Sequence, residues 1–109
     1  MKETADQAAS TARRILALFE EDHRKIEALG RPAASVLRVF QHLQTTPILS
    51  IAKAAAKLGV TFPTVAKSLE HLRSLGVLQE ITGRQRDRVF IYDRYVAILN
   101  EGTEKTGVA

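Results

Sequence analysis

The sequence has no cysteine and no long apolar run. Without cysteine the chain can form neither disulfides nor thiolate-ligated metal sites, and it lacks a thiol nucleophile. No segment approaches the roughly 18 consecutive apolar residues that a membrane-spanning helix requires. The polar, alanine-rich start is not typical of a secretory signal peptide. We therefore expect a soluble cytoplasmic protein.

Positive charge is concentrated in the middle of the chain. The 109 residues, 45% of them hydrophobic, suffice for one modest core but not for two. Residues 31–94 carry ten basic and four acidic side chains, whereas residues 1–30 and 95–109 each carry one net negative charge. The net charge is +4. A basic segment of this kind favours an acidic partner such as nucleic acid.

Residues 1–30 have the pattern of one long amphipathic helix. Thr4 and Gln7 fit a capping box at its start, and Gly30 fits its end. An apolar stripe with steps of three and four residues follows the helix and is broken at Asp22. The stripe either packs on its own domain or pairs two copies of the chain or two domains. The residues that would carry the pairing role are Ala12, Ile15, Phe19 and Ile26.

The sequence pattern of residues 31–101 predicts a second domain, which contains most of the expected helices. Its first helix begins at Pro32, and a short strand over Ile48 and Leu49 follows it. Ser50 then caps the next helix, and Gly59 ends that helix. Thr61 is expected to cap the following helix, which ends at Gly76. The core positions of this last helix are Phe62, Val65, Leu69 and Leu72.

After Gly76 the pattern changes from a helical to a strand period. Residues 77–82 and 88–93 predict two strands joined by a hairpin loop. A short helix over 94–100 follows, and residues 102–109 predict a flexible tail. The expected fold is mostly α with a small β-hairpin, in the element order of a winged helix-turn-helix preceded by a long helix.

The short connection between the third and fourth helices indicates a DNA-binding surface. A turn of this kind sets two helices at a steep angle, so that the second helix can enter a major groove. Its non-core side chains can donate hydrogen bonds to bases or phosphates, although the same residue types suit an ordinary solvated face. The candidate DNA contacts on this helix are Thr61, Pro63, Thr64, Lys67, Ser68 and His71.

The hairpin loop carries a second candidate DNA contact. Arg84, Arg86 and Arg88 alternate along the chain, so they can point to one side as it leaves the turn. Guanidinium groups at such a wing would engage phosphates or the minor groove. Asp87 offsets part of this charge, and a plain solvated turn is the alternative.

No catalytic or metal site is evident in the sequence. His23, His42 and His71 lie on different predicted helices, and none has a partner at metal-ligand spacing. There is no glycine-rich phosphate loop, and the acidic run at residues 20–22 fans around one helix. We expect neither a cofactor nor enzymatic activity from these residues.

Four stretches of the chain together resemble the C-terminal region of bacterial Fic-family proteins. They are Thr11-Ala12-Arg13-Arg14-Ile15-Leu16, Thr61-Phe62-Pro63-Thr64-Val65, the segment from Val89 to Tyr95, and Ile98-Leu99-Asn100-Glu101-Gly102-Thr103-Glu104. In that family a catalytic domain transfers AMP to a protein hydroxyl, and a linker helix leads from it into a winged helix-turn-helix. The resemblance implies that this chain is the linker helix and winged domain of such a protein.

The catalytic signature of that family, His-Pro-Phe-x-x-Gly-Asn-Gly-Arg, does not occur in this sequence. The AMP-transferring activity therefore cannot be assigned to these residues, and the chain is either a fragment or a shortened relative. We expect a linker or dimerisation helix at 1–30, a winged domain at 31–101 and a tail at 102–109. The predicted function is binding of double-stranded DNA in transcription regulation, and we expect the chain to form a homodimer. The alternative is a protein-interaction module that positions a Fic catalytic domain or its substrate.

Overall fold

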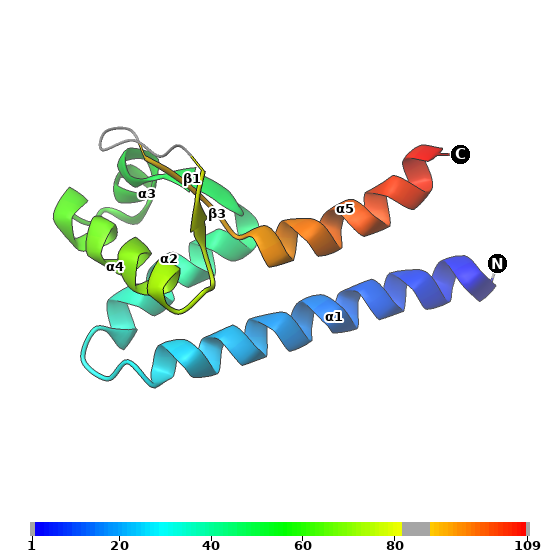
Figure 1. The fold of residues 1–109 in the computed structure, drawn as a ribbon, viewed down its shortest axis with the longest axis horizontal. Helices are drawn as coiled ribbons and strands as arrows, with labels where there is room; N and C mark the ends of the chain where they lie inside the picture. Colours follow the sequence, from blue (N-terminus) through cyan, green and yellow to red (C-terminus); the bar gives the residue numbers. More distant parts are fainter. Residues whose placement is uncertain (1, 82–87, 109) are drawn as a thin grey trace.

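The first and last helices of the chain lie side by side, and the remaining elements pack at one end of this pair (Figure 1). A computed structural model describes residues 2–81 and 88–108, which form five helices and a small three-stranded antiparallel sheet. In chain order the elements are α1 (Lys2–Glu27), α2 (Ala33–Thr45), β1 (Ile48–Ser50), α3 (Ile51–Leu58), α4 (Phe62–Ser74), β2 (Gln79–Glu80), β3 (Val89–Ile91) and α5 (Asp93–Val108). Within this described part, no helix is both long and apolar enough to cross a membrane.

The core lies where α2, α3 and α4 meet the sheet. Phe40 of α2, Leu69 of α4 and Phe90 of β3 are fully buried there. Burying an aromatic or leucine side chain contributes about 1.5–3 kcal/mol, so this cluster dominates the stability of the domain. The α1 helix joins the same core through Leu18 and Ile26.

Both ends of α3 follow the capping residues expected from the sequence, whereas α1 begins at Lys2 and so before the capping box expected at Thr4. The Lys53 backbone N–H donates to Ser50 Oγ at 3.2 Å, which confirms Ser50 as the cap of α3. Gly59 ends that helix in the left-handed conformation at a φ of 64°, and Gly30 follows α1 at a φ of 82°. A residue with a Cβ atom is strained in this conformation, which explains glycine at both positions.

The sheet has the strand order β1-β3-β2, with both pairs antiparallel. Leu49 of β1 pairs with Phe90 of β3, and both side chains face the core. Ile48, one residue earlier, points to the other face and is 47% exposed. The strand predicted at Ile48 and Leu49 is therefore confirmed, while the two later strands are shorter than expected.

Two local predictions are wrong, and that for Thr61 holds for its position but not for its side-chain bond. Phe62, expected in the core, is 53% exposed because it is the first residue of α4 and extends past the packed part of the helix. Thr61 adopts the extended conformation of a cap, but its hydroxyl makes no hydrogen bond to a backbone N–H of the helix. The last helix continues through Val108, so residues 102–108 are helical where we expected a tail.

The apolar stripe of α1 packs mainly on its own chain. The Phe19 ring lies 6.1 Å from that of Phe40 and 4.9 Å from that of Tyr95 in α5. Ile26 is fully buried and Ile15 packs against the core, whereas Ala12 is exposed. Of the two roles considered for the stripe, packing within the chain accounts for three of these four predicted interaction residues.

Candidate functional site

A connection of three residues joins α3 to α4, and the two helices pack against each other. After Gly59, the Val60 N–H donates to the Ala55 carbonyl at 3.2 Å, which completes the end of α3. Arg38 of α2 donates to the Leu58 carbonyl at 3.2 Å and so ties the same end of α3 to a third helix. These bonds fix the α3–α4 connection against the core, and the first turn of α4 is left at the surface.

The stretch of chain between the end of α1 and the middle of α4 carries positive charge and no acidic residue. No aspartate or glutamate occurs between Glu27 and Glu70. Five basic residues lie in that interval, namely Arg31, Arg38, Lys53, Lys57 and Lys67. The three lysines are exposed, and none of them forms an ion pair with an acid within residues 2–81 and 88–108. Their charge is therefore available to an external anion. We call Lys53, Lys57 and Lys67 the lysine face.

The candidate contacts at the start of α4 lie together at the surface. Thr61 and Pro63 are exposed, and Thr64 is half-buried. The Thr61 and Thr64 hydroxyl oxygens lie 2.8 Å apart and share a hydrogen bond. One hydroxyl proton is used in that bond, while the other is left for a ligand. Further along, Lys67 is exposed and His71 is half-buried.

Ser68 does not lie on this surface, which corrects its assignment as a DNA contact. Its side chain is only 2% exposed. It lines a small cavity of about 20 Å³ between α4 and α2, together with Ser35 and Val39. A signal in the sequence could have shown this, because Val65, Ser68 and Leu72 follow the three- and four-residue spacing of a buried stripe.

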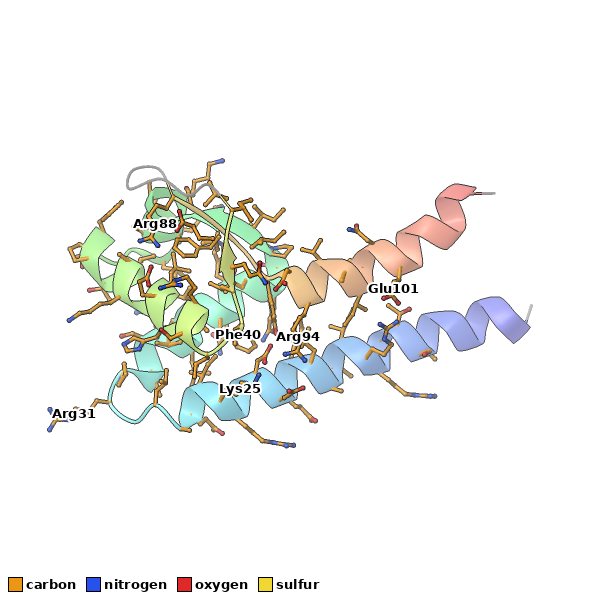
Figure 2. All side chains as sticks on the ribbon, viewed as in Figure 1. Lys25, Arg31, Phe40, Arg88, Arg94 and Glu101 are labelled. Atoms are coloured by element: carbon orange, nitrogen blue, oxygen red, sulfur yellow. The ribbon has the colours of Figure 1, made fainter. Side chains whose placement is uncertain are left out.

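Arg88 also does not present its charge to an external ligand, which corrects its assignment as a DNA contact. Its Nη2 atom lies 2.6 Å from Glu70 Oε2 and 3.0 Å from Glu80 Oε1. Its guanidinium carbon lies 5.0 Å from the Phe90 ring centre, and the side chain is 24% exposed. Figure 2 shows Arg88 among the elements near α4. Two carboxylates thus offset its charge.

We call Arg88, Glu70 and Glu80 the Arg88 clamp, because they tie α4 to the sheet. Arg73 adds a second guanidinium to Glu70, with its Nη2 at 3.0 Å from Oε1. These hydrogen bonds, chiefly that of Arg73, hold the pKa of the Glu70 carboxyl below its ordinary value. The other two arginines of the predicted hairpin, Arg84 and Arg86, lie outside the described residues.

A buried aspartate, Asp22, joins α1 to the rest of the chain. In the sequence it is visible only as a break in the apolar stripe. Asp22 is fully buried, and its Oδ2 atom accepts a hydrogen bond from the Tyr92 hydroxyl at 2.5 Å. Its Oδ1 atom lies 3.5 Å from Lys25 Nζ and 3.7 Å from Arg94 Nη1, and has no hydrogen-bond partner. Figure 2 shows Lys25 and Arg94 meeting between α1 and the start of α5. Burial, together with the bond to Asp22, raises the pKa of Tyr92 above its ordinary value.

Within the described residues, no group of three or more histidine, aspartate or glutamate side chains could hold a metal ion. The exposed polar groups at the start of α4 and on the lysine face are hydroxyl and ammonium groups. Such groups bind anions by charge and by hydrogen bonding. This surface therefore offers groups that are able to bind an anion.

No protein-family model and no curated protein matches the chain. Among solved structures it is similar to the crystal structure of RV1404 from Mycobacterium tuberculosis. The sequence identity is 16% and the TM-score 0.50, over 99% of this chain and 76% of the other. At this identity the likeness concerns the fold alone, and it extends over nearly the whole chain.

Proposed function

We propose that this chain is a winged helix-turn-helix module that binds double-stranded DNA. In this proposal α3 and α4 are the helix-turn-helix, α4 is the recognition helix, and β2 and β3 are the base of the wing. The observation that carries the proposal is the lysine face, whose three exposed cations form no ion pair with an acid of the described chain. Duplex DNA is a partner with the charge density that such a surface attracts.

The placement of the polar groups supports the same function. The N-terminal residues of a recognition helix are those that reach base edges, and Thr61, Pro63 and Thr64 lie at the surface there. Lys67 follows one turn later, where an ammonium can bind a phosphate. The candidate contact set is therefore Thr61, Pro63, Thr64, Lys67 and His71, with Arg84 and Arg86 retained from the sequence.

A pair of variants with equal loss of charge tests the proposal. The Lys57→Ala/Lys67→Ala variant removes two cations from the proposed surface. The matched Arg13→Ala/Arg24→Ala variant removes two exposed cations from α1. We expect the lysine variant to bind a labelled duplex more weakly and with a salt dependence shallower by about two in the logarithmic slope. The arginine variant should bind nearly as the unmodified chain does. Equal losses in both variants would contradict the proposed surface.

The resemblance to Fic-family proteins extends this proposal. We infer that the module is a regulatory part of a Fic-family protein and acts on DNA in the bacterial cytoplasm. The sequence stretches around Thr61 and from Ile98 to Glu104 support this assignment. The AMP-transferring activity would belong to a catalytic domain that these residues do not contain. An assay for AMP transfer with the chain alone should therefore give no product.

A second candidate function, protein interaction or homodimer formation, is favoured by the outer surface of α1. Leu16 is 62% exposed there, and Ala12 lies one turn away on the same exposed side. Phe19 and Ile26 are unsuitable probes of this function, because they pack within the chain. Sedimentation equilibrium of Leu16→Glu is the sharper test. A dimer of the unmodified chain that this variant converts to a monomer would support the interaction function, and a monomer in both cases would contradict it.

A further inference from the structure

The most exposed aromatic ring of the described chain stands at the start of the proposed recognition helix. Phe62 is the first residue of α4 and is 53% exposed. Phe62 lies at helical spacing from the buried residues Val65 and Leu69, so the sequence pattern places it on the core-facing side of the helix. The core ends one turn further along the helix, and the ring therefore extends past it to the surface.

The ring forms one wall of an open groove of about 340 Å³. The edge strand β1 lines the same groove, and its Ile48 is 47% exposed; Arg88, paired with Glu70 and Glu80, lines it too. Val89 adds a further apolar side chain, and Lys53 of the lysine face lies at the rim. The groove thus combines an apolar surface with an ammonium group that pairs with no acid of the described residues.

We propose that Phe62 is a specificity-determining residue that contacts the C5-methyl group of thymine in the major groove. This inference rests on the proposed DNA-binding function. The first residues of a recognition helix meet the base edges, and the thymine methyl is the apolar group that those edges present. The Lys53 ammonium at the rim has the charge that the neighbouring phosphate requires. In this arrangement the thymine methyl group contacts the Phe62 ring and the phosphate binds the Lys53 ammonium, so both parts of the groove have a partner on the DNA.

The test compares thymine with uracil, which differ in this methyl group alone. A duplex is selected from a random pool by the unmodified chain and is then resynthesised with deoxyuridine in place of each thymidine in turn. We expect one or two positions at which the replacement weakens binding about fourfold, the effect of removing one buried methyl group. In Phe62→Ala the thymine and uracil duplexes should bind equally. In Phe62→Leu, which keeps an apolar side chain, part of the preference should persist.

Leu16→Ala is the matched control, because Leu16 is also an exposed apolar residue but lies on α1. It should keep the full preference for thymine. Equal binding of the thymine and uracil duplexes by the unmodified chain would overturn the role of Phe62, and so would a preference that survives in Phe62→Ala. In either case duplex binding itself would stand. Absence of binding to any duplex at low salt would refute the proposed function together with this inference, and would favour an acidic peptide in the groove.

Discussion

Removal of one hydroxyl group, in Tyr92→Phe, should destabilise the chain far more than its size suggests. The Tyr92 hydroxyl donates a hydrogen bond to the fully buried Asp22 carboxylate at 2.5 Å. Without it, neither oxygen of Asp22 has a hydrogen bond, since Oδ1 already has none. Leaving a buried carboxylate without a hydrogen bond costs about 3 kcal/mol, even with the Lys25 and Arg94 cations at 3.5 and 3.7 Å from Oδ1. For a domain of this length the loss should lower the melting temperature by more than about 10 °C.

A second tyrosine provides the matched control. The Tyr95 hydroxyl donates to the Gln44 carbonyl at 2.8 Å, so Tyr95→Phe leaves only a neutral, partly buried acceptor without its partner. That change should cost about 1 kcal/mol. Urea unfolding monitored by circular dichroism measures both losses.

The double variant Asp22→Asn/Tyr92→Phe should be more stable than Tyr92→Phe alone, because the remaining buried group is then uncharged. If Tyr92→Phe cost no more than Tyr95→Phe, the hydrogen bond from Tyr92 to the buried Asp22 of α1 would not be what holds α1 in place.

Three further outcomes are expected. Because the pKa of Tyr92 is raised above 10 in the folded chain, the unfolded chain releases this proton first. Urea titrations should thus show stability falling above about pH 10, less so in Tyr92→Phe. Arg88→Met should lower the free energy of unfolding by about 1–2 kcal/mol. It should leave the salt dependence of DNA binding unchanged, because carboxylates already offset the charge of Arg88. A shallower salt dependence in this variant would show that Arg88 contacts a phosphate. Ser68→Ala should leave sequence preference in a selection experiment unchanged, whereas Thr64→Ala should alter it; an altered preference in the serine variant would place Ser68 at the DNA.

The helix boundaries could be predicted because their signals are local. Ser50 before α3 and Gly59 after it each satisfy backbone groups within a few residues, so the sequence contains both partners. The strand at Ile48 and Leu49 was also evident, as a short apolar run between turn residues. These features depend little on which other elements pack against them.

The candidate site was harder to predict because it depends on contacts between distant elements. Arg88 looks like a free cation in the sequence, yet Glu70, eighteen positions earlier, lies on the helix that packs beside it. Asp22 looks like a break in an apolar stripe, yet it accepts a hydrogen bond from Tyr92, which lies seventy positions later. Phe62 follows the spacing of a buried stripe, which says nothing of where the core ends. Periodicity gives the face of a residue but neither its distant partner nor its depth.

The most direct test of the DNA-binding surface is a titration of the isotopically labelled chain with a short duplex, followed by amide NMR shifts. We expect the amides of Thr61, Phe62 and Lys67 to shift first, together with those of the lysine face on α3. The amides near Arg13 and Arg24, on the exposed side of α1, should remain unchanged. Shifts confined to α1 and α5, or no shifts at low salt, would contradict the assignment of the α3–α4 surface to DNA.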